Sequence, residues 1–123
     1  MYRSPVLSRR QDRVYVNKAN LNFVGDASYT LAISDAYLTE VLTNSGSGQT
    51  VVIPASDDVN FPLGIGIPVT QIGAGVTTID PADGVTLNGG TASFTVDGQW
   101  ESVILTKIGT DAWMIRGAAS VVV

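Results

Sequence analysis

Apolar and polar residues alternate along most of the chain in short runs, and these runs end at Gly, Pro, Asn or Asp. In residues 29–33 and 92–96, every second residue is apolar. Side chains of a β-strand point alternately to opposite faces, so this period predicts strands with one buried face. Residues 37–43 fit either a strand or a short helical turn, because Leu38, Val41 and Leu42 suit both.

The strand-like runs are separated by regular turn signals, about every 8–12 residues. Asp80-Pro81 followed by Gly84, and Asp97-Gly98, are typical turn sequences. This spacing predicts an all-β domain, either an antiparallel β-sandwich or a jelly-roll-like arrangement. Strands are expected at residues 14–16, 21–24, 29–33, 50–53, 64–72, 76–79, 85–87, 92–96, 100–108 and 112–116.

The composition supports this fold class and excludes several chemistries. Val, Ile, Thr, Tyr, Phe and Trp make up 46 of the 123 residues, and these types favour pleated, half-buried surfaces. The chain has no Cys and no His. It therefore has no Ser-His-Asp triad, no Cys-His pair and none of the usual ligand sets for zinc, haem or iron–sulfur clusters. No enzymatic activity and no cofactor are expected.

The charge divides the chain into two parts. Residues 1–18 carry five basic residues and one Asp, a formal charge of +4, whereas residues 19–123 carry two basic and ten acidic residues, a formal charge of −8. We interpret residues 1–25 as an extended N-terminal arm and residues 26–123 as the β-domain. A basic arm on an acidic body suggests an interaction tail, and the partner-binding residues expected in it are Tyr2, Arg3, Arg9, Arg10, Arg13, Tyr15 and Lys18.

The acidic body argues against a domain that binds nucleic acid, which would carry a basic face. No run approaches the roughly 18–20 apolar residues that span a bilayer, and the N-terminus lacks the apolar stretch of a secretory signal. Neither a membrane nor a nucleic acid is therefore an expected partner, and synthesis in the cytoplasm is the expected starting point.

Two carboxylate groupings, Asp57/Asp58 and Asp80/Asp83, have the residue types of a Ca²⁺ site or an acid–base pair. Both groupings lie in turn sequences, where Asp is frequent because its side chain bonds the local backbone. The turn interpretation is favoured, and no metal is expected.

The aromatic residues Trp100 and Trp113 flank one turn of the chain. They fit packing in a core or a subunit contact, or an exposed pair that stacks on a sugar. The C-terminal residues Val121, Val122 and Val123 form an apolar end that a soluble protein should cover. We expect them to lie in an oligomer contact or to form a closing strand.

The order of turns and core positions resembles a module of tailed-bacteriophage virion proteins. The resemblance covers roughly residues 28–117 and is a pattern of short pieces. These pieces are Thr50-Val-Val-Ile-Pro54, Val59-Asn-Phe-Pro-Leu-Gly64, Gln71-Ile-Gly-Ala-Gly75, Thr77-Thr-Ile79, Gly84-Val-Thr-Leu-Asn88, Gly98-Gln-Trp100, Leu105-Thr-Lys-Ile-Gly-Thr-Asp-Ala-Trp113 and Gly117.

The resemblance implies a β-sandwich or jelly-roll-like fold, a non-enzymatic structural role and a symmetric homo-oligomer, with a trimer favoured. It carries no catalytic residues. The chain has no heptads and no collagen-like repeat for a fibre shaft, so a capsid decoration (cement) protein is the expected role. Its partner would be the major capsid protein or another virion protein, and its location the virion. The alternatives are a tail-fibre or tail-tip module and a carbohydrate-binding receptor domain.

Overall fold

The computed structural model describes residues 20–123, and in these residues the protein is all-β, as predicted. Eleven strands form two sheets that share one hydrophobic core. The one helical element among the described residues is η1 (Ile33–Ala36), a single 3₁₀ turn. The partner-binding residues predicted in the arm, Tyr2 to Lys18, lie outside the described residues.

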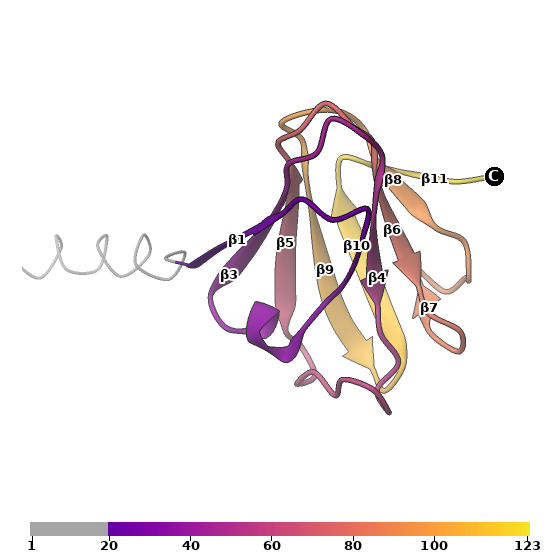
Figure 1. The fold of residues 1–123 in the computed structure, drawn as a ribbon. Helices are drawn as coiled ribbons and strands as arrows, with labels where there is room; N and C mark the ends of the chain where they lie inside the picture. The colour runs from indigo at the N-terminus through magenta and orange to yellow at the C-terminus, as the bar shows by residue number, and fades with distance from the viewer. Residues whose placement is uncertain (1–19) are drawn as a thin grey trace, which may run out of the picture.

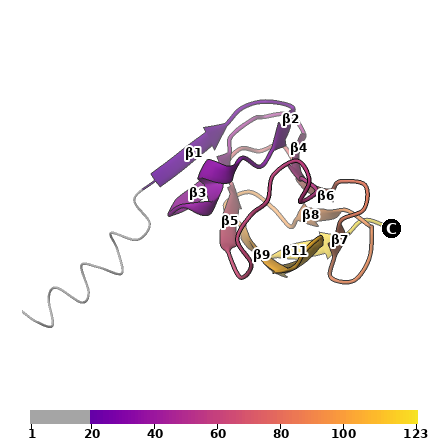
Figure 2. The same ribbon diagram turned by 90° about the horizontal axis from the view of Figure 1, so that it is seen from below.

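The six-stranded sheet, here sheet A, has β1 and β7 as its outer strands (Figures 1 and 2). In spatial order its strands are β1 (Asn20–Val24), β3 (Thr39–Thr43), β5 (Gly66–Gln71), β9 (Ser102–Gly109), β10 (Ala112–Gly117) and β7 (Thr86–Leu87).

The five-stranded sheet, here sheet B, lies opposite sheet A, and its outer strands are β11 and β2. In spatial order its strands are β11 (Ala119–Val121), β8 (Phe94–Val96), β6 (Thr77–Pro81), β4 (Gln49–Ile53) and β2 (Ser28–Thr30).

The first six strands alternate between the two sheets, so the chain winds in three successive coils. In sheet A, β1, β3 and β5 therefore pair in parallel, and β2, β4 and β6 do the same in sheet B. Beyond β6 the chain adds antiparallel strands next to β5 and β6. The prediction of purely antiparallel sheets was wrong, since both sheets are mixed. Short turns at regular spacing fit a hairpin and a coil equally well.

The coils stack closely at their corners, where the β3–β4 and β5–β6 connections lie together at the upper end of Figure 1. The amide of Gly75 donates to the carbonyl of Ser45 at 3.0 Å, and the amide of Gly73 donates to Thr43 at 2.9 Å. A Cβ at Gly73 would overlap the backbone of Ser45. Glycine is required there because one backbone rests directly on another.

Polar side chains, not apolar ones, fill the interior at these corners. Buried Gln49 donates through Nε2 to the carbonyls of Val24 and Asp26, and buried Gln71 accepts through Oε1 from the amide of Thr77. These amides supply hydrogen-bond partners that the corner backbone would otherwise lack, since few buried polar groups are left unpaired in proteins.

The core lies between the sheets and follows the period of two that the sequence shows. In β4 the residues at alternate positions, among them Val51 and Ile53, are fully buried, and β9 alternates in the same way. Phe61 packs edge-on against Trp113, with ring centroids 5.5 Å apart and an interplanar angle of 86°. Phe61 belongs to the long connection between β4 and β5, so this contact packs that connection against the core.

Candidate interaction surface

The outer face of sheet A carries several apolar side chains that nothing in the described residues covers. The cross-strand register places Phe23 beside Leu42, and Ile104 between Pro68 and Arg116. The side chains of Leu21 and Phe23 are 54% and 57% exposed, and those of Ile104 and Ile108 are also exposed. We call Leu21, Phe23, Ile104 and Ile108 the outer-face residues.

A row of polar groups crosses the same face. The hydroxyl of Thr70 donates to Oε2 of Glu40 at 2.8 Å, and it lies 2.6 Å from the hydroxyl of Ser102. These hydrogen bonds join β3, β5 and β9 and satisfy the polar side chains within the sheet. The outer face therefore combines paired polar groups with uncovered apolar ones, as interfaces between proteins do.

The position of β1 at the edge of sheet A is secured by a buried carboxylate. Asp35 in η1 accepts from the hydroxyl of Tyr29 at 2.6 Å, from Nδ2 of Asn22 at 3.0 Å and from the amide of Ala32 at 2.9 Å. Burial, the hydrogen bond to Asp35 and the negative charge of Asp35 together raise the pKa of the Tyr29 phenol to about 12. One side chain thus ties β1, β2 and η1 together.

Residues 21–24, predicted as a strand, do form one, and it pairs within the chain. They belong to β1, which is in register with β3 over all five of its residues. The pairing is parallel and joins residues about twenty positions apart, a separation that no local pattern reveals.

The two tryptophans, for which both packing and an exposed pair were considered, have different environments. Trp113 is 2% exposed and packs on Phe61 in the core. Trp100 is 70% exposed and has a φ of 69°. The left-handed region is strained for a bulky residue. The predicted strand at 100–108 accordingly starts at Ser102 instead.

Trp100 lies in the β8–β9 connection, next to the stacked corners. Its amide donates to the carbonyl of Gln71, and Nε2 of the adjacent Gln99 donates to the carbonyl of Ile72. An exposed indole therefore stands beside polar loops at one end of the molecule.

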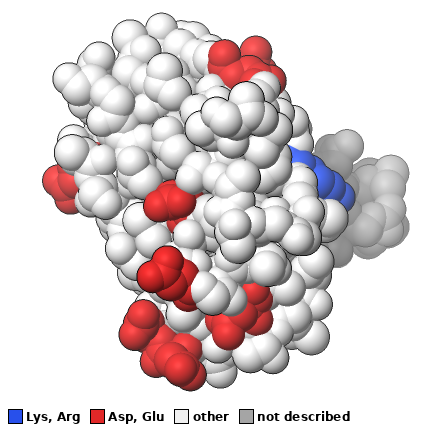
Figure 3. Space-filling model, turned by 90° about the vertical axis from the view of Figure 1, so that its right-hand side faces the viewer, with Lys and Arg blue, Asp and Glu red and all other residues white. Residues whose placement is uncertain are grey.

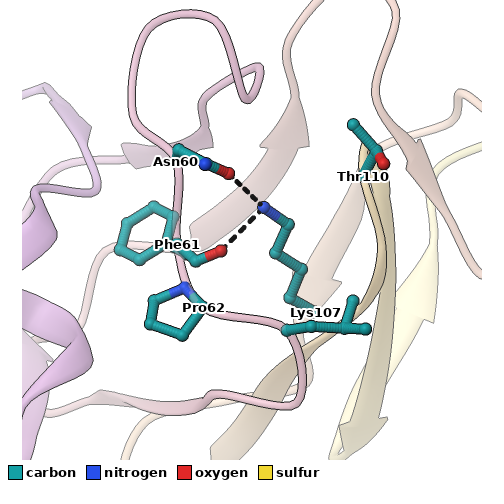
Figure 4. A pocket seen from close by; sticks show the side chains of 6 residues that line it. Asn60, Phe61, Pro62, Lys107 and Thr110 are labelled. Carbon is teal, nitrogen blue, oxygen red and sulfur yellow. Dashed lines mark hydrogen bonds between the residues drawn. The ribbon is translucent and has the colours of Figure 1, made fainter.

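A pocket of about 420 Å³ opens near the other end of sheet A (Figure 4). The ammonium of Lys107, a residue only 4% exposed, donates to Oδ1 of Asn60 at 3.1 Å and to the carbonyl of Phe61 at 2.8 Å. Both acceptors are neutral and belong to the β4–β5 connection. Lys107 thus fastens this connection to β9. The lining residues are Asn60, Phe61, Pro62, Leu63, Lys107 and Thr110.

Lys107 was not singled out from the sequence, although a signal was present. It follows Val103 and Leu105 at a spacing of two, so the alternation of β9 assigns it to the inward face. A lysine in an inward position needs oxygen acceptors, because a buried charge is costly when unpaired.

Asp57, Asp58 and Asp83 lie in turns, as predicted, and are exposed. The turn prediction was wrong for Asp80, which lies within β6 and is half-buried; its carboxylate accepts from the hydroxyl of Ser93 at 2.7 Å. Within residues 20–123, no group of three or more His, Cys, Asp or Glu side chains lies close enough to hold a metal ion.

The C-terminal valines lie at and beyond the outer strand of sheet B. Val121 is the last residue of β11, and Val121, Val122 and Val123 are all exposed. The amide of Val122 still donates to the carbonyl of Ser93 at 2.8 Å. A short closing strand is therefore present.

No family model matches the chain, and no curated protein matches it. In the part of the chain that the structure describes, no helix is long and apolar enough to cross a membrane.

Proposed function

We propose that this chain is a non-enzymatic structural protein of a tailed-bacteriophage virion, and that it acts as a capsid decoration protein. The observation that carries the proposal is the set of uncovered apolar side chains on the outer face of sheet A, Leu21, Phe23, Ile104 and Ile108. We also infer that the two sheets represent a β-sandwich-type fold in which parallel coils replace part of the antiparallel pairing.

Attachment to a shell suits this distribution of surface and charge. Exposed apolar side chains gain free energy when a partner removes them from water. The arm carries a formal charge of +4 and the body −8, so the arm is the part suited to an acidic capsid surface. Acidic side chains are spread over the face shown in Figure 3. Many weak contacts on one shell raise the effective concentration of each copy.

The direct test is retention of the protein on heads of the phage that encodes it. We expect the full chain to co-sediment with heads, and a chain that lacks residues 1–18 to stay folded but to lose attachment. Ile104→Lys should weaken retention at least tenfold, whereas Leu63→Lys, a charge at an exposed site in the β4–β5 connection, should not. Unchanged attachment by both the truncated chain and Ile104→Lys would refute the proposal.

The homotrimer that the resemblance implies is the alternative assembly, with Val121, Val122 and Val123 as its proposed oligomer contacts. The support is their exposure at the outer strand of sheet B. The proposed location is the virion, after synthesis in the host cytoplasm.

A carbohydrate-binding tip module of a tail fibre is the second candidate, and Trp100 is the observation that favours it. An exposed indole beside polar loops is a surface on which a sugar ring stacks. Glycan-array binding by the wild type that Trp100→Ala abolishes would support this function. An aqueous quencher should reach Trp100 but not Trp113, and a Trp100→Phe variant should show little quenching. Absence of any glycan binding would eliminate this candidate.

A further inference from the structure

We propose that β1 pairs edge to edge with β1 of a second copy, in antiparallel orientation, and so joins two A sheets into one. This inference deepens the proposed function, since it assigns Leu21 and Phe23 to a contact between two copies and leaves Ile104 and Ile108 for the capsid. The argument rests on the four outer strands of the two sheets, on the backbone groups that β1 leaves free, and on charge.

Among the described strands, β1 is the only outer strand without protection against pairing. The outer strands β2, β7 and β11 have three, two and three residues, whereas β1 has five. Proteins usually blunt an open edge with a charge, a proline, a bulge or a very short strand. The β1 sequence Asn-Leu-Asn-Phe-Val has no charge and no proline, and its register with β3 is regular.

The free backbone groups of β1 belong to its two exposed apolar residues. The amide of Asn20 donates to the carbonyl of Leu38, and the carbonyl of Val24 accepts from the amide of Asn44. In a parallel ladder every second residue bonds to one neighbour, so Asn20, Asn22 and Val24 face β3. The amides and carbonyls of Leu21 and Phe23 therefore face the open edge.

These groups are self-complementary when two copies meet across a two-fold axis at Asn22. Leu21 of one copy then lies opposite Phe23 of the other, and each such pair exchanges two hydrogen bonds. The same register places Leu21 beside Phe23 of the other copy on the outer face. Leu21 and Phe23 of the two copies, four exposed apolar side chains in all, thereby cover one another. The contact is isologous, because the same residues of each copy take part, as in a two-fold homodimer.

Charge favours a second copy as the occupant. The 19 residues that precede Asn20 carry the basic excess of +4, and the chain enters β1 at Asn20. In the antiparallel pair that point lies beside the Val24 end of the other copy, whose body carries −8. Opposite charges therefore approach each other, while β1 itself adds no repulsion.

Sedimentation equilibrium of the full chain tests the proposal. We expect a dimer at micromolar concentration, at least tenfold weaker dimerisation for Phe23→Lys, and an unchanged dimer for the matched control Leu63→Lys. A wild type that stays monomeric, a trimer, or a Phe23→Lys dimer of wild-type strength would overturn the inference.

Cysteine pairing tests the register, because the chain has no Cys of its own. Directly opposite residues of an antiparallel pair have Cα atoms about 5.5 Å apart, within reach of a disulfide. A mixture of Leu21→Cys and Phe23→Cys chains should therefore cross-link, and each variant alone should not. No excess of cross-linking in the mixture would refute this register.

The outcomes separate this inference from the proposed function. A monomeric protein that still attaches to heads removes the β1 pair and leaves the capsid role standing. A dimer with the expected register that does not attach to heads supports the β1 pair and refutes the capsid role.

Discussion

Gly73 and Gly75 show at the scale of single residues how backbone contact determines sequence. Both lie between the strands predicted at 64–72 and 76–79, where Gly-Ala-Gly separates two apolar runs and is typical of a turn. The structure adds a stronger reason, since a Cβ at either position would overlap the backbone of the stacked corner at residues 44–48. The stacking joins residues about 28 positions apart, and no local pattern indicates it.

Gly73→Ala should therefore lower the free energy of unfolding by about 1–3 kcal/mol, the usual cost of forcing extra volume into a packed site. Gly46→Ala is the matched control, because a Cβ there meets no atom within 4 Å. Its effect should stay within about 0.5 kcal/mol. Urea denaturation of both variants measures the difference, and equal values would contradict the stacking.

Tyr29 gives a prediction for pH. Its pKa is raised from 10.0 to about 12 in the folded state, so the folded protein holds this proton more tightly than the unfolded chain does. The contribution of Tyr29 to stability is therefore complete below about pH 10 and is lost as the pH rises through about 12.

Phenolate absorbance should show one late-titrating tyrosine that Tyr29→Phe removes. Asp35→Asn should lower the pKa of Tyr29, because it removes a negative charge and an ionised hydrogen-bond acceptor. An unshifted titration in Asp35→Asn would show that burial alone sets the value.

At the scale of elements, β9 shows which features of a strand can be predicted from the sequence and which cannot. Its alternation predicts Val103 and Leu105 on one face and Ile104 and Ile108 on the other, and the structure confirms this division. The predicted first residue of this strand was wrong, because Trp100 has a left-handed backbone conformation and the pairing of β9 begins only after it. The alternation of apolar and polar residues predicts which side chains of a strand are buried. It does not predict which strand pairs with it, or in which direction.

The side chain of Lys107 in β9 holds the β4–β5 connection through two hydrogen bonds. Lys107→Ala removes both hydrogen bonds to this connection and leaves the buried carbonyl of Phe61 unpaired. We expect a loss of about 1–3 kcal/mol in the free energy of unfolding. Arg116→Ala on the neighbouring strand β10, where the side chain is exposed, should change it by less than about 0.5 kcal/mol. Thermal denaturation of the two variants compares them.

At the scale of the whole molecule, the winding of the first six strands could not be predicted from the sequence. Parallel coils and antiparallel hairpins both need strands of this length and turns at this spacing. What decides between them is long-range pairing such as β3 with β5, which single-sequence patterns do not record. The exposure of Phe23 on the candidate surface could not be predicted either, because it depends on β1 being the outer strand of its sheet.

The coil architecture also explains why one end of sheet A remains open. Each coil covers the edge of the coil before it, and β1 belongs to the first coil among the described residues. Its edge therefore has no covering strand within residues 20–123. This open edge and the outer face beside it are the features from which the proposed assembly role follows.

Immunogold labelling of virions of the phage that we propose encodes this chain tests the central claim most directly. The account predicts label spread over the head surface, in many copies per particle. Label confined to the tail or its tip, or no label on purified virions, would contradict it.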